Sequence, residues 1–240
     1  MFTIYADAPT NFSYGFQDPA SNWMLGITHL HDTVIFYLII LCVVVLWISI
    51  SLLFNTDYLP NLAHGNLIEL VWTITPSMIL WVIGIPSLKL LYMMDEILDS
   101  EVTVKAIASQ WFWTYQYSDY VTEENETISI DSFMLAPEDL NIGDFRQLAV
   151  DNYLVLPINT SIRVLCTSND VIHSFAVPSI GIKADCLPGR LNSLGFIINR
   201  ESVYYGGCSE LCGSLHHAMP IGIKAVPLSS YLSFIQSVSE

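Results

Sequence analysis

Charged side chains are scarce in this chain, and basic ones are the scarcest. The 240 residues include 8 lysines and arginines against 23 aspartates and glutamates, a formal net charge of −15 at pH 7. Charged residues make up 13% of the sequence, about half the share found in a typical soluble domain. This composition argues against a wholly soluble protein. The shortage of Lys and Arg argues against nucleic acid as a partner and favours a basic partner.

Cysteine is also sparse, and its spacing excludes one class of small protein. The chain has 5 cysteines, too few and too unevenly placed for a disulfide scaffold. Hydrophobic residues, in contrast, make up 52% of the sequence, which is too many for a disordered chain.

Charge is almost absent from the first part of the chain. Residues 1–94 hold five acids and a single base, Lys89, whereas residues 95–240 carry a net charge of −11. Residues 34–54 form an uncharged run of 21 residues and residues 70–88 one of 19, each long enough to cross a bilayer core of roughly 30 Å. A signal peptide is excluded for the first run, because a basic start and a cleavage site are missing. The short, turn-rich linker predicts a transmembrane helical hairpin with both chain ends on one side.

Beyond the second run the pattern changes to short alternating stretches rich in strand-forming residues. Asn, Asp, Gly and Pro separate these stretches, which predicts one antiparallel β sandwich or barrel. The expected organisation is therefore an irregular N-terminal segment, a hairpin with spans at about 34–54 and 70–94, and a β domain. Their ranges are 1–27, 28–97 and 98–240.

One loop near the C-terminus concentrates residues that bind soft metal ions. Cys208, Glu210, Cys212, His216 and Met219 fall within twelve residues. Each has an ordinary interpretation alone: the cysteines as a redox dithiol or a disulfide, the histidine as a surface residue, the methionine as core packing. Their joint occurrence favours a metal site. A methionine ligand favours copper electron transfer over structural zinc.

A further histidine is needed to complete such a site. His173, in a strand-like stretch, is the single histidine of the β region outside the loop, and we expect it to be a ligand. A ligand on one strand and the others on a later loop is the arrangement of β-barrel copper proteins. The remaining cysteines are expected to be buried apolar residues: Cys42, Cys166 and Cys186.

The spacing Cys208-x-Glu210-x-Cys212-x3-His216-x2-Met219 resembles the binuclear copper centre of cytochrome c oxidase subunit II, in its mitochondrial form. The stretches PSLKLLYMMDE and QWFWTYQYSDY, and the order of two spans and a β domain, are similar to that family as well. The resemblance implies a cupredoxin-like Greek-key barrel after two transmembrane helices. It also implies a respiratory oxidase subunit that passes electrons from cytochrome c to the haem of subunit I, for oxygen reduction coupled to proton pumping.

The resemblance assigns a role to each ligand. Cys208 and Cys212 are expected to bridge two copper ions as thiolates, while His173 and His216 each bind one copper. Met219 is expected to be the weak ligand of one ion. By the same resemblance, the loop glutamate binds the other copper through its backbone carbonyl, and its side chain helps bind magnesium at the interface with subunit I.

The resemblance also implies roles outside the ligand set. Trp111 is similar to the tryptophan that receives electrons from cytochrome c, although packing would be the usual role of such a residue. Asp119, Asp151 and Asp170 stand where the family has carboxylates that dock cytochrome c. Two positions lack the acids common there: Gln116 and Asn169.

Glu69 has two interpretations. It is either an interfacial carboxylate at the linker end of the second span or a proton-path group, and the resemblance favours the second. The resemblance further places the chain in the mitochondrial inner membrane, beside subunits I and III, with both termini and the copper domain in the intermembrane space.

Two other classes of protein share part of this pattern. A copper-delivery protein or thiol reductase pairs two cysteines with a distant histidine, but it typically has one span and a thioredoxin-like α/β domain. A quinol oxidase subunit has the same architecture without copper ligands. The second span and Met219 oppose the first class, and the complete ligand set opposes the second.

Overall fold

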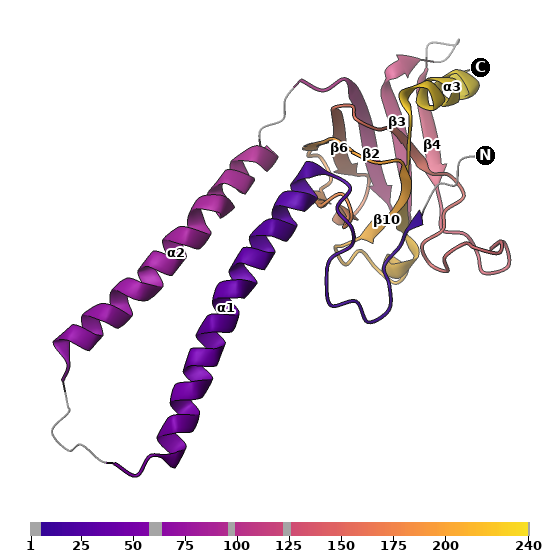
Figure 1. Ribbon diagram of the computed structural model, residues 1–240. Helices are drawn as coiled ribbons and strands as arrows, with labels where there is room; N and C mark the ends of the chain where they lie inside the picture. Colours follow the sequence, from indigo (N-terminus) through magenta and orange to yellow (C-terminus); the bar gives the residue numbers. More distant parts are fainter. Residues whose placement is uncertain (1–5, 58–63, 96–98, 122–125, 240) are drawn as a thin grey trace. The chain divides into compact units, whose positions relative to one another are not determined.

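The computed structural model describes residues 6–57, 64–95, 99–121 and 126–239 (Figure 1). The chain forms two compact units. One comprises Gly26–Met93, and the other combines Met1–Leu25 with Met94–Glu240. The second unit therefore draws on both ends of the chain, and the hairpin is inserted between its two parts.

The hairpin consists of two long helices, α1 (Asn22–Phe54) and α2 (Asn66–Asp95). Both are long and apolar enough to cross a membrane. Helix α1 begins inside segment 1–27, for which the sequence predicts irregular structure. Its start is capped by Ser21, whose Oγ accepts a hydrogen bond from the Met24 backbone N–H at 3.0 Å. The helix thus begins well before the uncharged run, because a helix is bounded by its caps whereas the uncharged run marks the bilayer core.

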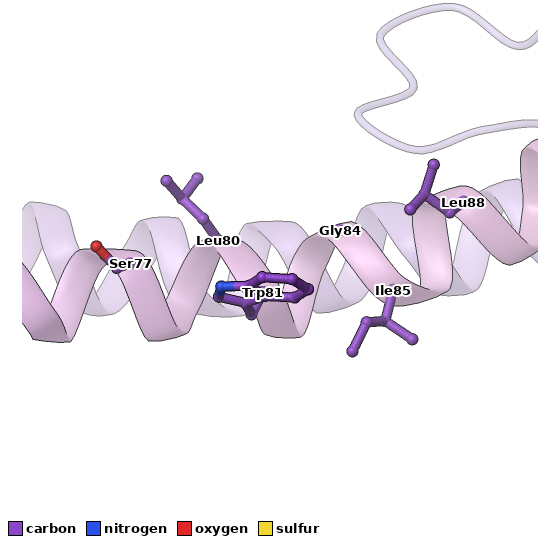
Figure 2. A pocket seen from close by; sticks show the side chains of 6 residues that line it. All are labelled: Ser77, Leu80, Trp81, Gly84, Ile85 and Leu88. Carbon is purple, nitrogen blue, oxygen red and sulfur yellow. The ribbon is translucent and has the colours of Figure 1, made fainter.

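Helix α2 contains two prolines, at positions 76 and 86, and remains continuous. One of its faces is hollowed, as Figure 2 shows, because Gly84 places no side chain between Trp81 and Leu88. No atom lies within 4 Å of where a Cβ of Gly84 would stand. The linker between the helices was expected to be turn-rich, and its residues 58–63 lie outside the described residues.

The β-rich unit is built from two sheets. The first has the strand order β4-β3-β2-β6-β9. Its strands are β2 (Val102–Ser109), β3 (Phe112–Val121), β4 (Thr127–Ser132), β6 (Ile162–Ser168) and β9 (Asn192–Phe196). All neighbours in it are antiparallel except β2 and β6, which are parallel. This parallel pair requires a crossover, as in Greek-key folds.

The second sheet has the order β5-β11-β10-β7-β8, with β1 also paired to β10. Its strands are β1 (Ala6–Asp7), β5 (Leu154–Pro157), β7 (His173–Val177), β8 (Ile182–Cys186), β10 (Ser202–Cys208) and β11 (Pro220–Val226). Strand β10 has two partners on one edge: its first half pairs with β1 and its last residues pair with β7.

The two sheets enclose one core of apolar and aromatic side chains. Trp113, Tyr115, Phe175, Tyr204 and Ile223 are among its residues, each exposed by 1% or less. Alternate residues of β2, β3 and β6 point into this core, as the period-2 pattern predicts. The expected all-β domain is confirmed in its main features.

The structure adds a C-terminal helix that sequence analysis did not predict. Helix α3 (Leu228–Ser239) buries Tyr231 and Ile235, one turn apart, and the Phe234 ring lies 5.8 Å from the Tyr117 ring. Strands β1, β4, β8 and β9 were also not predicted from the sequence. Strand β3 extends as far as Val121 into the charged segment that begins at Asp119, and residues 122–125 lie outside the described residues.

Candidate metal centre

Three neighbouring strands bring the sequence-predicted ligands together. His173 is the first residue of β7, and Cys208 is the last residue of β10 and pairs with Phe175. The chain then forms a loop that returns into β11 at Pro220, opposite Gly207. The Cys208 backbone N–H donates to the Met219 carbonyl at 3.3 Å, which closes the base of this loop. The register of β10 with β7 and β11 therefore determines where the ligands meet.

The two cysteine sulfurs lie at the middle of the cluster, 3.9 Å apart. His173 Nδ1 lies 3.8 Å from Cys208 Sγ, and His216 Nδ1 lies 3.6 Å from Cys212 Sγ. Met219 Sδ lies 3.6 Å from Cys212 Sγ. Ligand atoms of His173, Cys208 and Cys212 all fall within 4.8 Å of one another. Each sulfur thus faces one imidazole nitrogen across a small space.

The loop glutamate contributes its backbone. The carbonyl oxygen of Glu210 lies 3.2 Å from Cys208 Sγ, while its side chain is exposed. The neighbouring His217 is also exposed and no donor of the cluster comes from it. The structure therefore gathers all six sequence-predicted ligand residues at one place.

Burial makes the site unfavourable for a bare thiolate. Cys212 is 4% exposed, and burial, with the nearby Cys208 sulfur as the next cause, raises the pKa of its thiol to about 12. A thiolate at Cys212 at neutral pH therefore requires a compensating cation. Two sulfurs, two imidazole nitrogens and a thioether are the donors that copper prefers, so the residues present fit a copper site.

Asp170 is hydrogen-bonded to His173 at the ring nitrogen that does not face the sulfurs. Its Oδ1 lies 2.8 Å from His173 Nε2, which leaves Nδ1 as the lone-pair nitrogen facing the sulfurs. Its Oδ2 accepts a hydrogen bond from the Gln110 backbone N–H at 2.7 Å. Burial opposes ionisation of Asp170, but hydrogen bonds from His173, Val171 and Gln110 outweigh it and lower the pKa of the carboxyl. The Asp170 carboxylate therefore orients His173, although the Asp170 residue is itself exposed.

Two tryptophans flank the ligand loop. Trp111 is half-buried, and its indole packs against Gly213. A Cβ added to this glycine would lie 3.0 Å from the indole Cζ2. The Gln110 side chain donates to the Cys212 carbonyl at 2.8 Å. Trp113 is fully buried, and its Nε1–H donates to the Met219 carbonyl at 3.3 Å. The roles of Gln110, Trp113 and Gly213 were not predicted, and the QWFW motif, which contains the first two, is the sequence feature that could have indicated them.

The predicted docking acids lie at different distances from this cluster. Asp170 contacts it directly. Asp151 accepts a hydrogen bond from the Phe133 backbone N–H at 2.8 Å, and the Phe133 ring stacks 4.7 Å from Phe112 beside Trp111. Asp119 stands eight residues beyond Trp111, roughly 25 Å along β3 at the usual rise per residue. Asp170 and Asp151 are thus linked, through one and two contacts respectively, to a residue next to Trp111 in the chain.

The other sequence-predicted residues are placed as follows. Glu69 lies in the first turn of α2, where its carboxylate accepts a hydrogen bond from the Gly65 backbone N–H at 3.4 Å. Cys166 and Cys186 are buried as expected. The same prediction is wrong for Cys42, which is exposed on α1, because residues of a helix pair in a membrane face lipid or other subunits.

Family models match both parts of the chain. The transmembrane domain of cytochrome c oxidase subunit II matches residues 9–90, and the periplasmic domain of the same subunit matches residues 102–226. The chain belongs to the cytochrome c oxidase subunit II family. It is therefore a subunit of the oxidase complex, and its fold is the two-helix hairpin and cupredoxin-like domain that the family resemblance implied.

Individual proteins agree with this assignment. Cytochrome c oxidase subunit 2 of Cyanidium caldarium is 49% identical over 98% of this chain and 94% of its own length. The Schizosaccharomyces pombe protein of the same name is 48% identical over 99% and 98%. Members of the subunit II family thus match along both the hairpin and the β domain.

Solved structures match the β domain. The periplasmic domain of subunit II of cytochrome oxidase from Bradyrhizobium japonicum is 39% identical with a TM-score of 0.53, covering 60% of this chain and 96% of that one. A subunit II domain in a mixed disulfide with a thioredoxin-like protein is 36% identical with a TM-score of 0.51, covering 60% and 95%. The cupredoxin-like architecture excludes the thioredoxin-like alternative for this chain.

Proposed function

We propose that this subunit accepts electrons from reduced cytochrome c at a binuclear copper centre and passes them to the haem of subunit I, where oxygen is reduced to water. The observation that carries the proposal is the sulfur pair 3.9 Å apart, with an imidazole nitrogen beside each sulfur. A single-metal site needs one set of donors around one point. Here the donors are distributed about two sulfurs, which suits two ions.

The proposed ligand roles follow the geometry of the donors. Cys208 and Cys212 would hold both ions, and His173 and His216 would each hold one. Met219 is proposed as the weak ligand beside Cys212. Its thioether sulfur lies 3.6 Å from Cys212 Sγ. The Glu210 carbonyl, at 3.2 Å from Cys208 Sγ, serves the other ion. This distribution is supported by two donors lying beside each sulfur, those of His173 and Glu210 beside Cys208 and those of His216 and Met219 beside Cys212.

The protein's part in electron transfer is to keep these donors in place. A bound copper pair supplies one-electron exchange with the charge shared by two metals. The donors are restrained by the register of β10 with β7 and β11. They are also restrained by two hydrogen bonds, one between Asp170 and His173 and one between Gln110 and the Cys212 carbonyl. A restrained ligand set rearranges little when the charge changes, which favours fast transfer.

Trp111 is the proposed point at which electrons arrive. It is half-buried at the surface and its indole lies against Gly213 of the ligand loop. Cytochrome c is a basic protein, and the acidic β domain suits it through long-range attraction that salt weakens. Asp151 and Asp170 are proposed to dock it near Trp111, with Asp119 contributing at the far end of β3.

Further assignments rest on the family. The exposed Glu210 side chain is proposed to help bind magnesium at the contact with subunit I, since carboxylate and water oxygens suit that ion. Glu69 is proposed to belong to a proton-uptake path that serves proton pumping. The proposed location is the mitochondrial inner membrane, beside subunits I and III. Residues 1–27 and 98–240 would lie in the intermembrane space and 28–97 would form the membrane hairpin.

Copper content and electron spin resonance test the proposal. The purified oxidase is expected to contain two copper ions per chain at this centre and to show a seven-line hyperfine pattern, because one electron is shared by two copper nuclei. Near-infrared absorption should accompany it. A zinc ion, a bare dithiol, or one copper with a four-line pattern would contradict the proposal.

Replacement of Asp170 by alanine is expected to weaken the centre without removing a ligand. The change leaves His173 Nε2 without its carboxylate partner, and losing such a partner typically costs 10–100-fold in metal affinity. Competition with a copper chelator measures the affinity. Asp131→Ala is the matched control, because its Oδ1 bonds to the Thr114 hydroxyl and touches no ligand. Equal affinities for the two variants would contradict the orienting role.

Replacement of Trp111 by phenylalanine is expected to slow reduction by cytochrome c while copper content and spectrum stay unchanged. The expected loss is at least tenfold in rate, which corresponds to about 1.4 kcal/mol in the barrier. Stopped-flow mixing with reduced cytochrome c measures it. Phe112→Leu, at the next position and stacked on Phe133 instead of the loop, is the control. An unchanged rate in Trp111→Phe would show that electrons arrive elsewhere.

A further inference from the structure

A pocket lies between the two helices of the hairpin, at the end where α1 begins and α2 ends. Its volume is about 310 Å³. The helices approach closely there, because a Cβ on Gly26 would stand 2.8 Å from Leu90 Cδ1. His29 and Thr33 line the pocket from α1, and Lys89 lines it from α2.

The position of the pocket along the helices corresponds to the edge of the hydrocarbon core. Lys89 follows directly on the uncharged stretch 70–88, and it is the single Lys or Arg of residues 1–94. On α1 the uncharged run begins immediately after Thr33. Since the helices run in opposite directions, both uncharged runs end at this pocket, where lipid headgroups lie.

Two of the polar side chains that line the pocket, Lys89 and His29, are exposed donors that bond to no acceptor among the described residues. Among the described residues no carboxylate forms an ion pair with Lys89. The acid on α1 beside the pocket, Asp32, instead contacts His31 Nδ1 at 3.3 Å. The Thr33 hydroxyl donates to the His29 carbonyl at 2.9 Å. An ammonium group and an imidazole N–H therefore remain for a ligand, and the ammonium favours an anion.

The remaining walls are apolar. Leu30, Pro86, Leu90 and Met93 complete the pocket beside the cationic group. The hollow further along α2 in Figure 2 provides a contrast, because none of its six lining residues is charged. A cation above apolar walls, at headgroup depth, is complementary to a phosphate that carries acyl chains.

We propose that this pocket binds the headgroup phosphate of an anionic phospholipid, with Lys89 as its cationic contact, His29 as a second donor, and Leu30, Leu90 and Met93 against the first part of an acyl chain. This site belongs to the hairpin and does not depend on the copper centre. It adds a lipid ligand to a subunit whose hairpin otherwise offers anions almost no positive charge.

Photo-crosslinking of the assembled oxidase tests the proposal. The probe is phosphatidylglycerol with a photoreactive group at the start of one acyl chain, added to the detergent-solubilised complex, and labelled peptides are mapped by mass spectrometry. Label is expected on the peptides of 26–33 and 86–93. Lys89→Gln should reduce it about five-fold, the loss expected for one cationic contact, and Lys89→Arg should retain it. Lys183→Gln, an equal change of charge on exposed β8, should leave it unchanged.

Three results would overturn the proposal. Equal labelling by a phosphatidylcholine probe would mean that apolar contact alone holds the lipid, and displacement by inorganic phosphate would mean that the site takes a free ion. Absence of label from both wild-type peptides, with a protein neighbour crosslinked to Lys89 instead, would identify a subunit carboxylate as the occupant. If Lys89→Gln fails to assemble, the wild-type map and Lys89→Arg still decide between these results.

Discussion

Replacing Cys212 with serine is expected to abolish the copper centre. The Cys212 sulfur has three neighbours in the cluster: Cys208 Sγ at 3.9 Å, His216 Nδ1 at 3.6 Å and Met219 Sδ at 3.6 Å. A serine hydroxyl is a hard donor that stays protonated, so it cannot bridge two copper ions. Turnover with cytochrome c should fall by more than about 100-fold, beyond the 10–100-fold typical of losing a group that only supports a ligand.

Elemental analysis and electron spin resonance of the purified complex measure this loss. Cys212→Ser should lack the seven-line pattern and hold fewer than two copper ions at the centre. Cys42→Ser is the control, since Cys42 is exposed on α1 outside the β-rich unit and should keep both copper and turnover. Two copper ions and an unaltered spectrum in Cys212→Ser would refute the bridging role.

Replacing Gly206 with alanine is expected to have the largest effect on stability among the glycines of β10. A Cβ there would stand 2.1 Å from the Ala176 backbone oxygen and 3.0 Å from Val177 Cγ2. A backbone atom in a sheet has little freedom to move, so β7 and β10 would have to separate. These two strands carry His173 and Cys208. Overpacking usually costs about 1–3 kcal/mol, and a clash with backbone should lie at or above the upper end.

Thermal unfolding of the β domain measures this cost. At about 2–4 °C per kcal/mol for a domain of this size, Tm should fall by roughly 6–12 °C. Gly207→Ala is the matched control, because no atom lies within 4 Å of its Cβ position and the change should stay within about 1 kcal/mol. Equal shifts in both variants would show that the close approach of β7 and β10 is not what requires glycine.

The elements that the sequence predicts well are those whose pattern is long or strictly periodic. Uncharged runs revealed both membrane helices, and alternation revealed β2, β3 and β6, whose residues point alternately into the core. The β8 strand alternates as well but was missed, because its run of five residues is short and includes the charged residues Lys183 and Asp185. Helix α3 was missed although Tyr231 and Ile235 have helical spacing, since a 12-residue helix is stabilised mainly by packing on β3 and β5.

The site shows the same division between local and distant residues. Five ligand residues fall within twelve positions of one another, so a metal site was predictable from their types and spacing alone. His173 was predicted as a ligand because it is the single histidine of the β region outside that loop. The Gln110 contact with the Cys212 carbonyl and the Trp113 contact with the Met219 carbonyl each join residues about a hundred positions apart. No local pattern encodes such a contact, because it depends on the packing of one sheet against the other.

By itself, the amino-acid sequence determined that this protein crosses a membrane twice, carries an acidic β domain and holds a soft-metal ligand set, since hydrophobicity, charge and donor chemistry are properties of the residues themselves. Only the tertiary structure decided that each imidazole faces a different sulfur, that Asp170 orients His173, and that Lys89 and His29 line one pocket. The physical reason is that distances between side chains far apart in sequence follow from strand register and helix packing, which the whole chain determines together.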